Sequence, residues 1–187
     1  MAEQYIEDRR RKREEIKALG IDPYGRRLDG IESNGAVRAR AEGLGIEPGQ
    51  TLEGRTARAA GRIMLLRNMG KLCFMTVRDS TGDLQLGLSK NALGESGWEL
   101  VKRLDLGDIV AVDGVLGRTR TGEITVWGQA LHMLCKSVRP LPEKWHGLQD
   151  VETRYRQRYV DLFSNPPVLA TFRQRSAIIE AVRQHLL

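Results

Sequence analysis

The sequence predicts a mainly β protein with helices at both ends. From Gly54 onward, apolar and polar residues alternate with the period of two that is typical of strands, and helical patterns precede and follow this region. Within it, three strands come first, then a helix, then two more strands. This is the order of the OB-fold, a five-stranded Greek-key barrel in which a helix joins the third and fourth strands. A generic mixed α+β sheet is the alternative, and it does not specify a helix at that connection.

An N-terminal helical extension is predicted for residues 1–53. Residues 3–18 are good helix formers without Gly or Pro, and Gly20 stands where a C-terminal cap is expected. Apolar residues are few in this segment, so the helix is expected to lie on a surface rather than in a core. Ser33 is placed to cap a second, shorter helix.

The basic run from Arg9 to Arg13 has two interpretations. Its side chains either face a phosphate backbone or form a solvated helix face on which they pair with acidic neighbours. Acidic residues flank the run on both sides, at Glu7, Asp8, Glu14 and Glu15, and we therefore favour the paired face.

Residues 54–138 are predicted to form the barrel. In its second strand, Leu72, Phe74 and Thr76 share one face, and Cys73, Met75 and Val77 share the other. In its third strand, Leu84, Leu86 and Leu88 lie opposite Gln85 and Gly87. A helix is predicted over residues 91–104, and residues 108–120 and 124–138 are expected to form the closing hairpin. Glycines at 61, 87, 107, 114 and 117 suit the bends of a small barrel.

The composition favours a polyanionic partner. The formal net charge is +6 and the isoelectric point is near 9.6. Such an excess is common in nucleic-acid-binding proteins, although some basic proteins bind no nucleic acid. The charged N-terminus lacks the apolar core of a secretory signal, and no run of about 18 apolar residues is present. We therefore expect a cytoplasmic protein without a membrane segment.

No catalytic constellation is recognisable in the sequence. A Gly-rich phosphate loop, a nucleophile elbow and a zinc-protease motif are all absent. Cys73 and Cys135 lie in apolar strand patterns and are expected to be reduced structural thiols rather than metal ligands. The histidines, His132, His146 and His185, are scattered and are expected to be structural or exposed. We therefore expect neither a catalytic residue nor a metal site in this chain.

Four residues are candidates for contacts with nucleic acid. OB-folds bind single strands across strands two and three with aromatic and basic groups. Phe74 is the only aromatic residue on the first three strands, but its face of the strand is equally able to fill the barrel. Gln85 lies on a polar face and is able to contact a base edge, whereas Arg67 and Glu123 are either groove residues or ordinary surface charges. Further candidates, for contacts with an RNA backbone, are Arg78, Lys71, Arg118 and Arg120.

Three segments resemble the N-terminal part of class II lysyl-tRNA synthetases. They are GRIMLLRNMGKLCFMTVRDSTGDLQL, LDLGDIVAVDGVLGRTRTGEITV and KSVRPLPEKWHGLQDVETRYRQRYVDL, and LGIDPY also matches. The resemblance extends over nearly the whole chain and is weakest over residues 26–53. The third segment distinguishes the lysyl enzymes from the aspartyl and asparaginyl enzymes, which share the barrel.

The resemblance implies that the barrel binds the anticodon stem-loop of a lysine tRNA. In the family an aromatic stack and polar contacts hold the middle uridine, and by motif these fall on Phe74, Arg67, Gln85 and Glu123. Arg78 is a departure, because lysyl enzymes often carry Gln there. We expect Arg78 to add positive charge to the groove.

The resemblance also implies how the rest of the chain is organised. Residues 139–162 would connect the barrel to a catalytic domain, and residues 163–187 would begin that domain with the helix of motif 1, the dimerisation element. The full-length enzyme would use ATP and Mg2+ to attach lysine to tRNA. Motifs 2 and 3 are not in this chain, so we expect it to bind tRNA without activating lysine and to self-associate weakly through its tail. A freestanding OB-fold RNA-binding protein and a subunit-interaction module that uses the tail are the alternatives.

Overall fold

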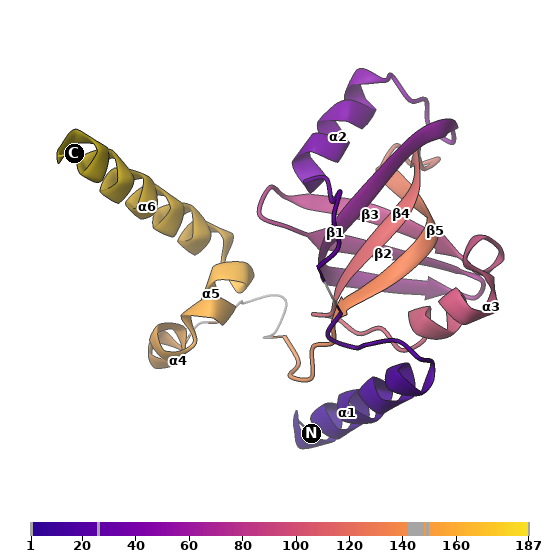
Figure 1. Cartoon of the computed structure of the whole chain (residues 1–187), viewed down its shortest axis with the longest axis horizontal. Helices are drawn as coiled ribbons and strands as arrows, with labels where there is room; N and C mark the ends of the chain where they lie inside the picture. Colours follow the sequence, from indigo (N-terminus) through magenta and orange to yellow (C-terminus); the bar gives the residue numbers. More distant parts are fainter. Residues whose placement is uncertain (1, 26, 142–147, 149, 187) are drawn as a thin grey trace. The chain divides into compact units, whose positions relative to one another are not determined.

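The computed structural model describes residues 2–25, 27–141, 148 and 150–186. It divides into two compact units, Met1–Pro140 and Leu141–Leu187, and each is described by itself. In the first unit, strands from purple to orange in Figure 1 form a barrel, and helices lie around it.

The barrel confirms the predicted OB-fold order. Its strands are β1 (Thr51–Met69), β2 (Leu72–Arg78), β3 (Asp83–Ser89), β4 (Ile109–Arg118) and β5 (Ile124–Cys135), and α3 (Lys90–Val101) follows β3. Around the closed barrel the strands run β1-β2-β3-β5-β4. Neighbouring strands are antiparallel except β3 and β5, which are parallel. Closure gives every strand one face in the core and one face outside.

The alternation in β2 and β3 directs the predicted apolar set inward. The buried side chains of these strands are Cys73, Met75 and Val77 in β2 and Leu84, Leu86 and Leu88 in β3. Phe74 and Gln85 are half-buried at positions between them, on the outer face. The interpretation of Phe74 as a core residue is therefore wrong, because its neighbours in the strand occupy the inward positions.

The helix between β3 and β4 differs from the prediction in two respects. It spans Lys90–Val101 instead of residues 91–104, and its backbone is broken at Gly94, where φ is 69° and ψ is −178°. Glycine adopts a positive φ without steric cost, so Gly94 separates a short first turn from the main helix. The buried residues of this region are Trp98, Leu100, Val101 and Leu104, and Leu93 packs partly buried against the same core.

Two predicted helices precede the barrel. They are α1 (Ala2–Ala18) and α2 (Asn34–Gly43). Gly20 follows α1 with a φ of 75°, as expected for a residue that ends a helix. The Ser33 hydroxyl accepts a hydrogen bond from the main chain at the start of α2 and acts as its N-cap.

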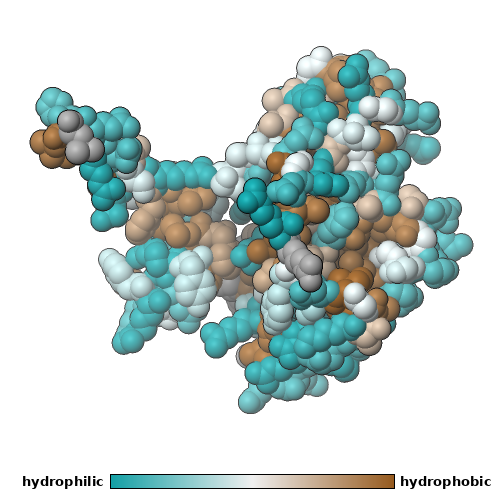
Figure 2. Space-filling view, viewed as in Figure 1, coloured by the Kyte–Doolittle hydropathy of each residue, from teal (hydrophilic) through white to brown (hydrophobic). Residues whose placement is uncertain are grey.

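The contacts of α1 with the rest of the first unit include a buried apolar residue and two ion pairs. Ile16 is fully buried and belongs to the core. Lys12 Nζ lies 2.6 Å from Asp105, and Glu15 lies 3.0 Å from Arg103 Nε. Figure 2 shows a mainly hydrophilic surface over α1, which agrees with a helix that lies on a surface.

The basic run of α1 is engaged in local contacts. Arg10 and Arg11 pair with the acidic residues Glu7 and Asp8 one turn earlier in the helix. Arg9 differs, because it is almost fully buried and donates to the main-chain oxygens of Ser137 and Arg139. The structure therefore agrees with the paired helix face that we favoured.

A buried lysine ties the end of β5 to the loop before β4. The Lys136 side chain is fully buried, and its Nζ lies 2.7 Å from Asp108 Oδ2 and 2.6 Å from Asp105 Oδ2. The Lys136 ammonium group also donates a third hydrogen bond, to the main-chain oxygen of Arg103 at 2.9 Å. Asp108 also accepts from the main-chain N–H groups of Ser137 and Asp105. Each ammonium proton has an acceptor, which is the condition for burying this charge.

The pKa values of the two carboxyl groups in this cluster are shifted in opposite directions. Burial raises the pKa of Asp108, and the nearby Lys136 only partly offsets it. Burial also acts to raise the pKa of Asp105, but the ammonium groups of Lys12 and Lys136 outweigh it and lower that pKa. Asp105 is therefore the carboxylate that joins α1 to the buried lysine.

The second unit contains the helices α4 (Val151–Arg156), α5 (Arg158–Ser164) and α6 (Pro166–Leu186). The helix α6 lies within residues 163–187, where the tail helix was expected. Part of the predicted connector lies outside the described residues, namely residues 142–147, which include His146, and residue 149. Leu187, at the end of the tail, also lies outside them.

The carboxylate of Asp161 lies at the centre of the second unit. It is fully buried and accepts from Arg154 at 3.0 Å, from Asn165 at 2.6 Å and from Arg158. The guanidinium of Arg158 also lies over the ring of Phe172, 5.1 Å from its centroid, so it links α5 to α6. Most of the rest of α6 is exposed, and Ile178, Val182 and Leu186 present apolar side chains to solvent.

Replacing Lys136 by Met should lower the free energy of unfolding by about 3–5 kcal/mol, because Asp108 then stays buried without its counter-ion. Urea unfolding followed by circular dichroism measures this. Lys102→Met is the matched control, since Lys102 is half-exposed and forms a surface ion pair with Glu99, and it should change stability by less than about 1 kcal/mol. Wild-type stability of Lys136→Met would contradict the role assigned to this charge.

Limited digestion with trypsin should cleave after Arg175 and Arg183 before it cleaves within the barrel. No described residue of α6 is buried, and a helix of about 20 residues that buries so little surface is marginal in water. Mass spectrometry of timed samples identifies the order of cleavage. Cleavage between residues 54 and 135 ahead of α6 would contradict this prediction.

Candidate nucleic-acid interface

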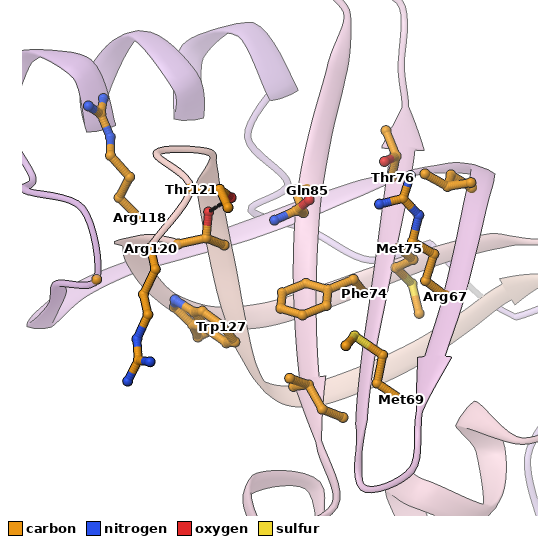
Figure 3. A pocket seen from close by; sticks show the side chains of 14 residues that line it. Arg67, Met69, Phe74, Met75, Thr76, Gln85, Arg118, Arg120, Thr121 and Trp127 are labelled. Atoms are coloured by element: carbon orange, nitrogen blue, oxygen red, sulfur yellow. Dashed lines mark hydrogen bonds between the residues drawn. The ribbon is translucent and has the colours of Figure 1, made fainter.

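A cavity of about 510 Å³ lies on the outer side of the barrel, next to the turn between β4 and β5. Three of the residues predicted to contact bases line it: Arg67 of β1, Phe74 of β2 and Gln85 of β3. Of the predicted backbone contacts, Arg118 and Arg120 also line it, and Figure 3 shows how these side chains surround the cavity.

Arg67, Phe74, Gly87 and Trp127 form one row across four strands. The strand register pairs Arg67 with Phe74, Phe74 with Gly87, and Gly87 with Trp127. Paired residues share a face of the sheet, so the guanidinium and both rings lie on the outer surface. The rings of Phe74 and Trp127 are 5.7 Å apart between centroids and inclined at 68°, an edge-to-face arrangement.

Gln85 supplies a polar edge beside Phe74. Its Nε2 donates to Thr125 Oγ1 at 2.8 Å, and that hydroxyl donates to the main-chain oxygen of Glu123 at 3.1 Å. The amide is therefore oriented by β5. Its oxygen has no donor among the described residues, and it is able to accept a hydrogen bond from a ligand.

Glu123 is the one predicted base contact that does not line the cavity. Its carboxylate lies 3.2 Å from Nη2 of Arg38 in α2, and Arg38 also donates to the main-chain oxygen of Asp83 at 2.9 Å. Glu123 is nevertheless 47% exposed, and its neighbours Thr119 and Thr121 line the cavity. The carboxylate therefore lies at the rim, where an arginine of another element holds it.

Two of the predicted backbone contacts also lie outside the cavity lining. Arg78 donates to both carboxylate oxygens of Asp83, at 2.5 and 2.8 Å, and this contact raises the pKa of Arg78. The positive charge that we expected Arg78 to add is thus neutralised by Asp83 of the same hairpin. Lys71 is exposed in the turn between β1 and β2. The arginines that line the cavity are Arg67, Arg118 and Arg120.

Trp127 is an aromatic cavity residue that the sequence analysis missed. It is half-buried in β5, and its neighbours Val126 and Gly128 are buried, so its side chain points outward. Its Nε1 is buried and has no hydrogen-bond partner among the described residues. An aromatic residue at an outward position of a barrel strand was the available signal.

Other groups that carry chemistry are dispersed. Cys73 and Cys135 are free thiols, and burial raises the pKa of Cys73 to about 11, which keeps it protonated. His132 Nε2 lies 2.9 Å from Asp113, which also pairs with Arg58, and His185 lies in the exposed part of α6. Within the described ranges, no group of three or more His, Cys, Asp or Glu residues is placed to hold a metal ion. None of the helices described is both long and apolar enough to cross a membrane.

Comparison with known proteins finds a matching domain family and longer relatives. Residues 57–141 match the family described as OB-fold nucleic acid binding domain. A lysine--tRNA ligase of Dehalococcoides mccartyi is 46% identical over 187 residues, which cover all of this chain and 37% of that protein. A lysine--tRNA ligase of Pelotomaculum thermopropionicum is 46% identical over 178 residues, which cover 95% of this chain and 34% of that protein.

The chain matches only part of the length of each of these relatives. A lysine--tRNA ligase of Carboxydothermus hydrogenoformans is 41% identical over 97% of this chain and 36% of its own length. The chain therefore spans about a third of the length of the curated relatives that it matches. Along its whole length it is similar to the N-terminal part of lysine--tRNA ligases, and its residues 57–141 match the model of the OB-fold nucleic acid binding domain.

Proposed function

We propose that this chain binds the anticodon stem-loop of a lysine tRNA through the cavity lined by Arg67, Phe74 and Gln85. The observation that carries the proposal is the outward position of Phe74, between a cation on β1 and an amide on β3. An exposed aromatic face stacks on a base of any identity, and neighbouring polar groups select among bases. The similarity to lysine--tRNA ligases supports the choice of tRNA.

In this proposal the selection of uracil depends on Gln85 and Glu123. Uracil presents an N3–H donor between two carbonyl acceptors, whereas cytosine presents an acceptor at N3. The free amide oxygen of Gln85 and the Glu123 carboxylate are acceptors suited to such a donor. Arg118 and Arg120 then contact phosphates, which position the RNA without reading its sequence.

The proposal places the chain within a larger enzyme. The full-length ligase would attach lysine to this tRNA in the cytoplasm, as a homodimer, and ATP and Mg2+ would serve that step rather than the barrel cavity. The exposed apolar residues Ile178, Val182 and Leu186 of α6 would then belong to a contact with a second copy of the chain.

Replacing Phe74 by Ala should weaken binding of a lysine tRNA anticodon stem-loop about tenfold or more, because one stacked base contributes about 1–3 kcal/mol. Fluorescence anisotropy of a labelled stem-loop at fixed salt measures this. Tyr5→Ala removes an aromatic ring that is 62% exposed on α1, and it should leave the affinity unchanged. Equal affinity of a folded Phe74→Ala variant and wild type would contradict the stacking role.

Replacing Glu123 by Gln should narrow the preference for uracil over cytosine at the middle anticodon position by about tenfold, or about 1.4 kcal/mol. The amide is able to donate to cytosine N3, whereas the carboxylate accepts only. Affinities for the two stem-loops give the ratio directly. Glu42→Gln removes the same charge from an exposed position of α2 and should leave the ratio unchanged. A wild-type protein that binds both stem-loops equally would refute the selectivity assigned to Glu123.

A further inference from the structure

The indole of Trp127 lies flat against the barrel. A Cβ atom on Gly87 would come within 2.6 Å of Cε3 and Cζ3, and one on Gly117 would come within 2.7 Å of Nε1. These atoms lie at opposite ends of the indole, and the two glycines belong to β3 and β4, on either side of β5. Both ends of the ring system therefore lie close to strand backbones, and one π-face of Trp127 is turned outward.

The lack of side chains at Gly87 and Gly117 makes this arrangement possible. A methyl group at either position would overlap with the indole and push it away from the sheet. Trp127 also lines the same cavity as Phe74 and Arg67. A flat, half-exposed indole at a cavity wall is the geometry of a stacking surface.

The inclination between the two aromatic rings limits what each is able to bind. The planes of Phe74 and Trp127 differ by 68°, with centroids 5.7 Å apart. A planar base that lies parallel to one ring is therefore steeply inclined to the other. One base is not able to stack on both rings, so two stacked bases are needed to cover both.

Each ring has a cation beside it. Arg67 is the register partner of Phe74 on β1, and Arg120 extends past Trp127 from the turn between β4 and β5 (Figure 3). Arg120 is exposed, and no ion pair involving it occurs among the described residues. The cavity thus repeats the pairing of a π-face with a guanidinium, which suits two consecutive nucleotides with their phosphates.

We propose that Trp127 stacks on the nucleotide adjacent to the one held by Phe74, and that Arg120 contacts the phosphate of that second nucleotide. This inference rests on the proposed function, because it places a second subsite in the same cavity. It makes Trp127 a residue that touches the ligand rather than one that only supports Phe74.

Coupling between protein variants and abasic substitutions in the RNA tests the inference. Stem-loops are prepared with a single abasic site at each loop position and titrated against wild type, Phe74→Leu and Trp127→Leu. In wild type, the abasic site under Trp127 should weaken binding about tenfold. In Trp127→Leu the same abasic substitution should not weaken binding further, because the stacking interaction that it removes is already absent. The position coupled to Trp127 should be next to the position coupled to Phe74.

Fluorescence separates ligand contact from structural support. Stacking on a base quenches indole emission, so the stem-loop should reduce the emission of wild type by more than that of Trp127→Phe. Trp127→Phe keeps an aromatic face and should retain more affinity than Trp127→Leu, and thermal unfolding checks that both variants are folded.

The outcomes distinguish this inference from the function on which it rests. If Phe74 couples to one loop position and Trp127 to none, or if emission is equally quenched in Trp127→Phe, the second subsite is refuted and the proposed function stands. If neither residue couples to any loop position, the proposed function fails together with the subsite.

Discussion

Closure of the barrel depends on the pairing of β1 with two different strands. Its residues 56–62 pair with β4 and its residues 62–69 pair with β2, with a register shift between Ile63 and Leu65. Gly61 lies at the changeover, where a Cβ atom would come within 2.8 Å of the main-chain oxygen of Arg78. The absence of a side chain lets the two strands approach closely as β1 bends. The far end of β1 then lies beside β2, and this pairing brings Arg67 next to Phe74.

Strand alternation predicted the fold well but left the side of Phe74 open. Leu72 and Phe74 on one face of β2 are as apolar as Cys73 and Met75 on the other, so hydrophobicity does not tell inside from outside. Closure decides the matter, because it sends Cys73 and Met75 into the core. The helix before β4 was predicted as one segment because periodicity does not register the positive φ of a single glycine, which breaks it at Gly94.

The sequence predicted which candidate residues lie together where their proximity depends on neighbouring strands, and it missed contacts that depend on distant parts of the chain. Arg67, Phe74 and Gln85 lie on three consecutive strands joined by short turns, so their proximity follows from strand order. The contact between Arg38 and Glu123 joins residues 85 positions apart, and no local pattern indicates it. Trp127 meets Phe74 only because β5 pairs with β3 in parallel, across the intervening α3 and β4. The positions of these residues are properties of the closed barrel.

The flat indole has a consequence for how this surface is able to change during evolution. Because a Cβ atom at residue 87 would overlap with the ring at residue 127, residue 87 is not free to gain a side chain while the tryptophan is retained. A descendant that acquires alanine at the first position has to lift or lose the tryptophan, and one that loses the tryptophan removes the reason for the glycine. The pair is expected to covary across an alignment, and a barrel with a bulkier residue at the first position would present a single aromatic face rather than two.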